Sequence, residues 1–335
     1  MTQEHFKNIF LKGDVLQDIL GQDHVKNELK SAMLMGRHVL IIGPPGIGKT
    51  TLAKNVAKLL PELEVNDCAY HCDPQKPMCP ECKQGKSKKR IISGAERFVR
   101  IQGSPDLTAE DLIGDIDPAK ALQYGPLSIE AFTPGKIFKA NQGVLFFDEL
   151  NRCPEKLQNA LLQALQEGYV TIGSYDVDLQ ANFIFIATMN PEDPTTEKIG
   201  DVLLDRFDVV YMSYPETLEI EVAIVKKSGK QLIKFPEKLL TTGVLFVRLL
   251  RENKDVERAP GVRASIGLYE RAQANAFLAR RNTVTLNDLK EAIVSVVAHR
   301  IKLKPSVSYL ESEVDFVKEQ VEKFLAENVK ESDLT

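Results

Sequence analysis

Short apolar runs alternate with amphipathic stretches through the first two-thirds of the chain. Continuous apolar runs of strand length are typical of parallel strands that helices cover on both faces. Five such runs are present, namely His38–Gly43, Phe98–Ile101, Val144–Asp148, Phe183–Thr188 and Val209–Met212. The intervening Thr51–Leu60 and Glu155–Glu167 carry apolar residues at helical spacing. This pattern predicts a doubly wound α/β domain with a five-stranded parallel sheet.

The pattern changes after Tyr214 and becomes helical. Four amphipathic stretches follow, namely Thr217–Ser228, Pro236–Arg251, Arg263–Arg281 and Leu286–Lys302. A chain of 335 residues is also longer than one hydrophobic core usually supports. We therefore expect two domains, an α/β domain over residues 1–214 and an all-helical domain over residues 215–335.

Composition narrows the function classes. Hydrophobic residues make up 43% and charged residues 27% of the chain, which excludes a fibrous or wholly disordered protein. The formal charge is −4, from 43 basic and 47 acidic side chains, so an obligate nucleic-acid binder is not expected. Tryptophan is absent and aromatic residues account for 7%, which argues against an aromatic-rich carbohydrate-binding or membrane-interface surface.

The sequence favours a cytoplasmic location. The first residues do not match an export signal, because charges flank a short apolar stretch and a small-residue cleavage site is missing. The longest apolar runs, such as Val144–Phe147, have strand length, so we expect no membrane insertion. The chain has five cysteines, an odd number. Together with the missing export signal, this count points to a reducing compartment.

A glycine-rich segment between the first apolar run and the first helical stretch matches the P-loop pattern. Its residues are Gly43, Pro44, Pro45, Gly46, Ile47, Gly48, Lys49 and Thr50, and we extend the binding segment to Thr51. Glycines let successive backbone N–H groups turn toward phosphates, and the helix that follows points its positive end at them. Lys49 would contact the β- and γ-phosphates, and the Thr50 hydroxyl would be a Mg²⁺ ligand. The strand–loop–helix context predicts a nucleotide site rather than an accidental match.

An acidic pair, Asp148 and Glu149, ends the third apolar run. Side chains at the carboxyl ends of parallel strands face the ligand-binding edge of the sheet. Asp148 would hold the Mg²⁺ shell, and Glu149 would polarise the attacking water. The alternative is a surface pair that merely ends a strand. The P-loop earlier in the chain favours the catalytic interpretation.

Two further polar residues are candidates for the same site. Asn190 follows the fourth apolar run and could orient the attacking water; the alternative role is to cap the turn before Pro191. Arg206 lies between Leu204 and Phe207, and its flexible guanidinium suits a contact to a neighbouring subunit's γ-phosphate. A lone arginine is otherwise more often part of a surface salt bridge.

Four motifs in this order, followed by a helical domain, resemble an AAA+ ATPase: GPPGIGKT, LFFDELNR, ATMNPED and LLDRFD. Within this superfamily the chain resembles the magnesium-chelatase ATPase subunit (subunit I) and the MoxR group. Three segments, Gly114–Leu122, Phe132–Lys136 and Ala140–Asn151, are similar to the chelatase subunit almost segment by segment. The resemblance extends from about Gly21 to Ala298.

The resemblance implies a role for individual residues. Asn190 matches the first sensor, Arg206 the arginine finger, and Arg263 the second sensor on the helical lid. Gly21 and Gln22 match the element that flanks the adenine. Arg263 is expected at the start of a helix, where a hinged lid would bring the charge of this arginine onto the γ-phosphate.

Two insertions also resemble this group. One spans residues around Leu112–Lys139, and the other is a hairpin over Tyr169–Leu179. Alternating β-branched and polar residues on both sides of Gly173 independently predict a two-stranded hairpin. In similar ATPases such a hairpin faces the pore of the ring or its partner; the alternative is a plain edge ribbon.

The resemblance further implies a ring, typically a hexamer, that hydrolyses ATP to ADP and phosphate with Mg²⁺ and remodels or activates a partner protein. That partner would carry an integrin-like (von Willebrand A) domain. Insertion of a metal into a tetrapyrrole is one output of such rings, but the sequence offers no porphyrin pocket of its own. A nucleic-acid-translocating AAA+ motor and an ATP-gated assembly scaffold are the alternatives. The hairpin tip lacks basic residues and has Tyr175 as its aromatic residue, which argues against nucleic acid.

Four cysteines are grouped before the second apolar run: Cys68, Cys72, Cys79 and Cys82. Four thiolates this close in sequence can surround one tetrahedral ion, and the two-residue spacing of the last pair is typical of zinc knuckles. We expect a closed structural site with zinc preferred over an iron–sulfur cluster, while unligated or redox-active thiols remain alternatives. His71 could substitute for one cysteine. The fifth, Cys153, reads as a small buried apolar residue.

Overall fold

The computed structural model describes residues 2–13, 15–85, 87–172, 177–191 and 199–328. The chain divides into two compact units. The first unit holds most of the residues up to Met212. The second holds the residues from Ser213 onward together with Leu20–Gln22 and Pro44–Ile47. Each unit is described by itself.

A five-stranded parallel sheet forms the centre of the first unit, in the order β11-β1-β10-β7-β4. Its strands are β1 (His38–Ile42), β4 (Phe98–Gln102), β7 (Val144–Asp148), β10 (Ile184–Met189) and β11 (Phe207–Tyr211). The middle of β1 and the first four residues of β7 are buried, because helices cover both faces of the sheet. The predicted five-stranded parallel sheet is confirmed.

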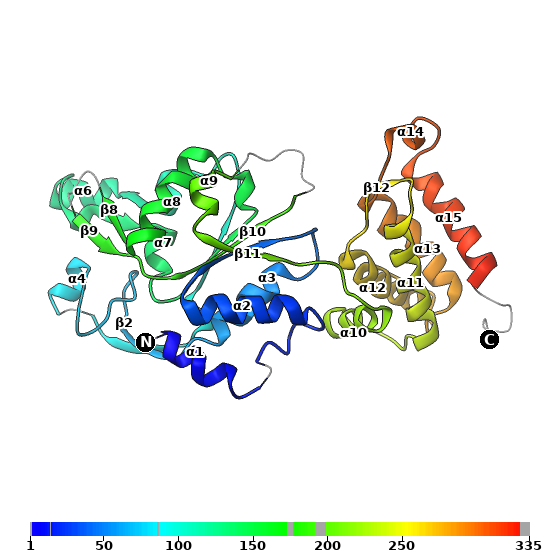
Figure 1. The fold of residues 1–335 in the computed structure, drawn as a ribbon, viewed down its shortest axis with the longest axis horizontal. Helices are drawn as coiled ribbons and strands as arrows, with labels where there is room; N and C mark the ends of the chain where they lie inside the picture. Colours follow the sequence, from blue (N-terminus) through cyan, green and yellow to red (C-terminus); the bar gives the residue numbers. More distant parts are fainter. Residues whose placement is uncertain (1, 14, 86, 173–176, 192–198, 329–335) are drawn as a thin grey trace. The chain divides into compact units, whose positions relative to one another are not determined.

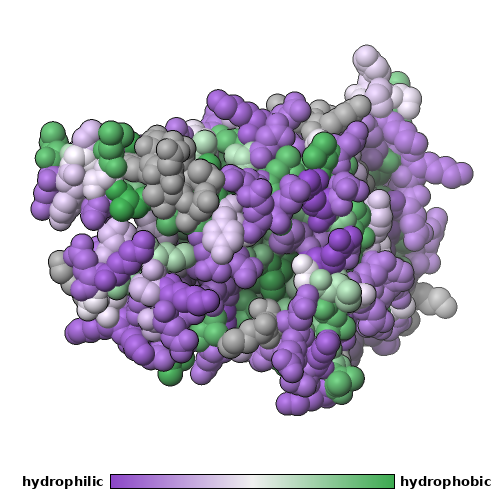
Figure 2. Space-filling view, turned by 60° about the vertical axis from the view of Figure 1, so that its left-hand side comes forward, coloured by the Kyte–Doolittle hydropathy of each residue, from purple (hydrophilic) through white to green (hydrophobic). Residues whose placement is uncertain are grey.

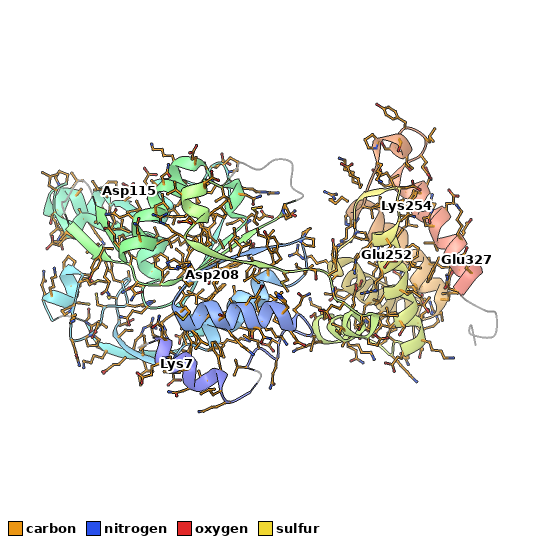
Figure 3. The ribbon with its side chains drawn as sticks, in the orientation of Figure 1. Lys7, Asp115, Asp208, Glu252, Lys254 and Glu327 are labelled. Atoms are coloured by element: carbon orange, nitrogen blue, oxygen red, sulfur yellow. The ribbon has the colours of Figure 1, made fainter. Side chains whose placement is uncertain are left out.

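Helices of the first unit flank this sheet. They include α1 (Thr2–Phe10), α2 (Asp23–Met35), α3 (Lys49–Lys58), α7 (Lys136–Lys139), α8 (Glu155–Glu167) and α9 (Asp201–Leu204). In the view of Figure 1, α2 runs below the strands and α8 lies above them. An ion pair ties the segment after α2 to the sheet, since Arg37 Nε lies 3.2 Å from an oxygen of Asp208 on β11. Asp208 is labelled in Figure 3. Both helices predicted in this half of the chain are present.

Insertions project from the first unit as short antiparallel ribbons. One pairs β5 (Gly114–Ile116) with β6 (Phe132–Pro134) and carries α6 (Pro118–Tyr124) between them. The predicted hairpin consists of β8 (Tyr169–Ile172) and β9 (Val177–Gln180). Its tip, residues 173–176 with Tyr175, lies outside the described residues. The residue pattern predicted the hairpin, whereas the first insertion was expected from the family resemblance.

A third ribbon, which the hydrophobic pattern did not indicate, frames the cysteine segment. It pairs β2 (Leu63–Asn66) with β3 (Lys89–Ile92), and α4 (Pro80–Lys83) lies in the segment between them. Three of the four residues of β3 are exposed, so its sequence lacks a continuous apolar run. A short helix, α5 (Ala109–Leu112), follows β4 and is capped by Thr108.

A buried arginine joins this ribbon to the sheet. Arg97 is 1% exposed and donates to the backbone carbonyls of Ser93, Gln142 and Pro61. Burial lowers the pKa of its guanidinium. The three carbonyls come from segments that precede β2, follow β3 and precede β7. Arg97 therefore holds three separate segments of the chain together.

The second unit is helical, as predicted. Its helices are α10 (Leu218–Ser228), α11 (Glu237–Glu252), α12 (Val262–Leu278), α13 (Leu286–Val297), α14 (Pro305–Ser308) and α15 (Glu313–Asn328). One difference is a short antiparallel pair of β12 (Val256–Arg258) with β13 (Lys302–Leu303). The predicted Leu286–Lys302 helix is therefore too long. It ends at Val297, because Lys302 pairs with Arg258 instead of extending the helix.

A buried carboxylate organises the core of the second unit. Glu221 is fully buried and accepts hydrogen bonds from both terminal nitrogens of Arg251, each at 2.7 Å, and from Ser265 Oγ at 2.6 Å. Arg248 Nη1 lies 3.2 Å from the same carboxylate. Despite its burial, these donors lower the pKa of Glu221.

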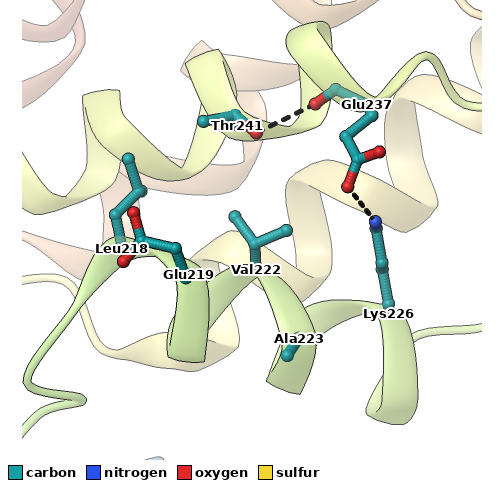
Figure 4. A pocket seen from close by; sticks show the side chains of 7 residues that line it. All are labelled: Leu218, Glu219, Val222, Ala223, Lys226, Glu237 and Thr241. Carbon is teal, nitrogen blue, oxygen red and sulfur yellow. Dashed lines mark hydrogen bonds and ion pairs between the residues drawn. The ribbon is translucent and has the colours of Figure 1, made fainter.

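Hydrophilic residues predominate on the face drawn in Figure 2. A surface groove of about 240 Å³ lies between α10 and α11, where Lys226 pairs with Glu237 at 2.6 Å (Figure 4). Its lining residues are not those predicted to bind nucleotide. Within the described residues, none of the helices combines the length and apolar character needed to cross a bilayer.

Candidate nucleotide site

The P-loop follows the first strand directly. β1 ends at Ile42 and α3 begins at Lys49, so the loop enters a helix N-terminus as the motif requires. Gly46 and Gly48 have φ angles of +79° and +102°, which L side chains rarely adopt. Lys49 Nζ donates to the carbonyl oxygen of Gly43 at 2.6 Å, which holds the ammonium against the loop. Thr50 and Thr51 lie in the first turn of α3.

Asp148 lies at the carboxyl end of β7, where neighbouring strands supply its partners. Thr188 Oγ1 on β10 donates to one carboxylate oxygen at 2.7 Å. Arg100 Nη2 on β4 donates to the other at 2.6 Å. The Asp148 side chain is 15% exposed, so these bonds act in a partly dehydrated position. Two strands thus fix the orientation of this carboxylate.

Glu149 directly follows β7 in a left-handed backbone conformation, with a φ of 57° and a ψ of 55°. Such a conformation costs on the order of 1 kcal/mol for a residue with a side chain. The Glu149 backbone N–H donates to Thr188 Oγ1 at 2.9 Å. Its carboxylate accepts a hydrogen bond from Gln102 Nε2 at 2.9 Å and lies 3.3 Å from Arg152 Nη1. The acidic side chain is therefore held on the same sheet edge as Asp148.

A glycine permits the close approach of β4 to this turn. A Cβ on Gly103 would lie 2.0 Å from the Glu149 carbonyl oxygen, which no side chain could tolerate. The Gly103 N–H donates to the Asp148 carbonyl at 2.7 Å. The strand–turn junction at the acidic pair is thus packed backbone against backbone.

The sequence pattern did not indicate Arg100, Gln102 and Thr188 as site residues. All three are polar residues at or near the ends of otherwise apolar strands, which is the one signal that could have marked them. Their contacts depend on strand order, because β4 and β10 both pair with β7. That order was not predicted from the sequence.

Asn190 lies beside the turn that follows the acidic pair, whereas Arg206 makes separate contacts in the first unit. Asn190 follows β10, and its carbonyl accepts a hydrogen bond from Asn151 Nδ2 at 3.2 Å. Arg206 follows α9 and donates to the Val202 carbonyl at 2.6 Å and to Gln166 Oε1 at 3.0 Å. Among the described residues, Arg206 Nε is buried without a hydrogen-bond partner.

Arg263, Gly21 and Gln22 belong to the second unit, which also includes the central P-loop residues. Arg263 is exposed in the first turn of α12, and a Cβ on Gly46 would lie 3.0 Å from its Cγ. Gln22 has a positive φ of 58°, and its Nε2 donates to the Ser213 carbonyl at 2.8 Å. Arg263 thus lies against the P-loop backbone, and Gln22 contacts the start of the helical segment.

The four predicted cysteines come together at a second position in the first unit. Their Sγ atoms all lie within 4.8 Å of one another, and Cys72, Cys79 and Cys82 are buried. Burial raises the pKa of Cys79 to about 12, and a hydrogen bond with Cys72 raises that of Cys68. His71 does not belong to this group within the described residues. The arrangement can hold one metal ion.

Three family models match successive parts of the chain. The model "Magnesium chelatase, subunit ChlI" matches residues 15–83. The model "ATPase family associated with various cellular activities (AAA)" matches residues 85–209, and "AAA lid domain" matches residues 258–320.

Individual relatives agree with these matches. The chain is 29% identical over 317 residues to the magnesium-chelatase subunit ChlI homolog of Methanocaldococcus jannaschii, covering 86% of this chain and 85% of the relative. It is 27% identical over 296 residues to the magnesium-chelatase 38 kDa subunit of Acidiphilium rubrum, covering 80% and 84%. A solved RuvB structure from Thermotoga maritima aligns with a TM-score of 0.51 at 17% identity, covering 84% of this chain and 72% of that one. At this identity the likeness shows a shared fold only. The comparisons therefore place the similarity of this chain with the AAA+ ATPases and, within them, with the ATPase subunit of magnesium chelatase.

Proposed function

We propose that the protein hydrolyses ATP to ADP and phosphate and uses the reaction to remodel or activate a partner protein, in the manner of the chelatase and MoxR group. The observation that carries this proposal is the arrangement of Asp148 and Glu149. Thr188 binds both residues, and Gln102 holds the Glu149 carboxylate at the sheet edge onto which the P-loop strand also opens. In this proposal residues 1–214 bind the nucleotide and residues 215–335 act as its lid.

An AAA+ ATPase implies ATP and Mg²⁺, and the residues present fit both. Gly46 and Gly48 have positive φ angles, which would let backbone N–H groups turn toward a phosphate, and Lys49 would add a positive charge beside them. Thr50 and Asp148 would hold the magnesium ion, which neutralises phosphate charge when bound. Glu149 would accept hydrogen bonding from the attacking water and orient it in line with the γ-phosphate.

Asn190, Arg206 and Arg263 act at the γ-phosphate in this proposal. Asn190 orients the water together with Glu149, and Arg263 contacts the phosphate from the lid. Gly21 and Gln22 flank the adenine. Arg206 serves the neighbouring subunit of a ring, which we propose to be a hexamer. Its support is that none of its hydrogen bonds in the described residues involves its own acidic pair or P-loop.

A mixing experiment tests the role of Arg206 between subunits. Rings that contain Arg206→Ala or Glu149→Gln subunits separately are expected to hydrolyse little ATP. Mixed rings should recover part of the activity, because some interfaces then combine an intact arginine with an intact glutamate. The measurement is the steady-state ATPase rate against the mixing ratio. A rate that stays at the average of the two variants in well-mixed rings would contradict the assignment.

Thr188 is expected to act as a positioning residue. Thr188→Val keeps the shape of this fully buried side chain but removes the hydroxyl that contacts Asp148 and the Glu149 backbone. We expect kcat to fall about ten- to hundredfold while ATP affinity changes little. Thr188→Ser should restore most of the rate, since it retains the hydroxyl. Equal losses for both variants would indicate a packing role instead.

We propose that the partner is a protein with an integrin-like (von Willebrand A) domain. Purification of Glu149→Gln protein with ATP bound is the test, because a trapped state should retain its partner longest. Recovery of such a protein, or of a single metalloenzyme, supports remodelling, and recovery of nucleic acid alone contradicts it. A basic run, Lys83–Arg90, follows the cysteines. It gives little support to nucleic-acid binding, since Lys89 and Arg90 pair with Glu64 and Asp67 at 3.3 and 3.2 Å.

We further propose that the cysteine cluster holds a structural zinc ion. Its four sulfurs match the number of ligands in a closed structural zinc site. We also propose a cytoplasmic location, since free thiols persist in a reducing compartment.

A further inference from the structure

The cysteine cluster is assembled from two local turns in the segment between β2 and β3. Cys68 and Cys72 lie on either side of a tight turn in which His71 has a φ of 44°. Cys79 directly precedes the short helix α4, and Cys82 lies inside it. Zinc–sulfur bonds of about 2.3 Å place tetrahedral sulfurs roughly 3.8 Å apart. Because the four Sγ atoms already lie within 4.8 Å of one another, a small inward movement would complete that geometry.

The ligand atoms restrict the kind of metal ion that this site can bind. All four ligand atoms are sulfurs, a set that suits zinc or iron and not magnesium or calcium. A four-iron cluster places iron and inorganic sulfide between the cysteines and needs wider spacing than this cluster offers. Burial of Cys72, Cys79 and Cys82 leaves little access for water or substrate. A closed tetrathiolate position is typical of structural zinc.

Backbone N–H groups already point at the sulfurs. The Cys72 N–H donates to Cys68 Sγ at 3.3 Å. The Met78 and Cys79 N–H groups donate to Cys72 Sγ at 3.4 and 3.5 Å. Such donors stabilise the negative charge that a metal-bound thiolate carries. This is independent support for a site built to hold thiolates.

Tyr70 links the cysteine segment to the first insertion directly and to the base of the hairpin by way of Asn141. The Tyr70 ring lies 6.0 Å from that of Phe138 on α7, which in turn lies 6.1 Å from Phe132 on β6. The Tyr70 carbonyl accepts a long hydrogen bond, 3.5 Å, from Asn141 Nδ2. Asn141 Oδ1 accepts one from the N–H of Asn182, just after the hairpin strand β9. The cysteine turn, α7 and the hairpin base therefore meet at one junction.

We infer that one zinc ion bound by Cys68, Cys72, Cys79 and Cys82 braces this junction and keeps α7 and the base of the β8–β9 hairpin ordered. The inference rests on the zinc occupancy proposed above and adds what the metal does. Asn141 precedes β7, whereas Asp148 ends it, and five strand residues span roughly 13 Å. The brace thus acts at the opposite end of β7 from the acidic pair. Metal loss should disorder the insertions and leave nucleotide binding intact.

Metal content is the first measurement. The full chain, purified without chelator, should contain about one zinc per chain by elemental analysis. Cys82→Ser should lose most of it. Cys153→Ala is the matched control, because Cys153 is also buried but lies outside the cluster. Cys68→His should retain zinc, since imidazole is also a zinc ligand. Iron in place of zinc, or no metal even after addition of Zn²⁺ alone, would overturn the occupancy.

Hydrogen exchange then tests the brace. Zinc-loaded protein and protein depleted by a chelator are compared by mass spectrometry, and Zn²⁺ is added back to show reversibility. Exchange is expected to rise over α7 and residues 180–184 but not over α13, and MgATP affinity should stay unchanged. Zinc that binds while exchange at both insertions stays the same would overturn the brace but not the occupancy. Loss of MgATP binding together with zinc would overturn the separation of the two sites.

Discussion

Lys49→Ala protein is expected to lose ATP hydrolysis almost completely. The ammonium of Lys49 lies beside the P-loop backbone, 2.6 Å from the Gly43 carbonyl, and is positioned to neutralise the β- and γ-phosphates. Removal of such a charge lowers kcat/KM by about 10²- to 10³-fold in comparable sites and also weakens nucleotide binding. Phosphate release and titration with a fluorescent ATP analogue measure the two effects.

Lys54→Ala is the matched control for this prediction. Lys54 lies on the same helix as Lys49 and is exposed, so its loss should leave both binding and hydrolysis unchanged. Similar losses in the two variants would indicate damage to α3 rather than to the phosphate site. Full ATP affinity in Lys49→Ala protein would show that the P-loop assignment is wrong.

Glu149→Gln is expected to separate binding from hydrolysis. The amide keeps the size of the side chain and its contact with Gln102 but can no longer attract a proton from the attacking water. We expect kcat to fall about 10²- to 10⁴-fold while ATP affinity stays within a few-fold of the original. Single-turnover hydrolysis and equilibrium binding of ATP give the two quantities.

Glu167→Gln provides the comparison, because Glu167 ends α8 on the surface of the first unit. This variant should hydrolyse ATP at the normal rate. Hydrolysis that persists in Glu149→Gln protein would contradict the proposed role of Glu149. Asp148 and Asn190 would then be the next candidates for activating the water. Loss of ATP binding in Glu149→Gln protein would mean that the left-handed turn at this residue had collapsed.

Hydrophobic patterning predicted the central sheet and the major helices because these elements bury long apolar runs. The strand Val144–Asp148 was placed with its observed ends, and the P-loop was placed between β1 and α3. Both depend on local signals, namely apolar runs and glycine spacing. Strands such as β3, with three of four residues exposed, carry no such signal.

The partners of the acidic pair could not be predicted for a different reason. Arg100 and Thr188 reach Asp148 from opposite sides because β4 and β10 flank β7. Strand order in a parallel sheet is a property of the whole fold, since each crossover can place the next strand on either side. The end of α13 was misplaced for a related reason: Lys302 forms a strand pair with a segment about forty residues earlier, a contact of the whole fold.

Arg97 should make three segments of the first unit dock cooperatively during folding. Its guanidinium has no carboxylate partner among the described ion pairs and is satisfied by three carbonyl groups from separate segments. A buried cation with any of these acceptors missing would be costly, so no intermediate with a partly docked segment is favourable. The segments that contain Pro61, Ser93 and Gln142 should consequently gain protection from exchange in a single kinetic phase during refolding. The cysteine segment, which lies between the first two, would then close only after the sheet that supports it has formed.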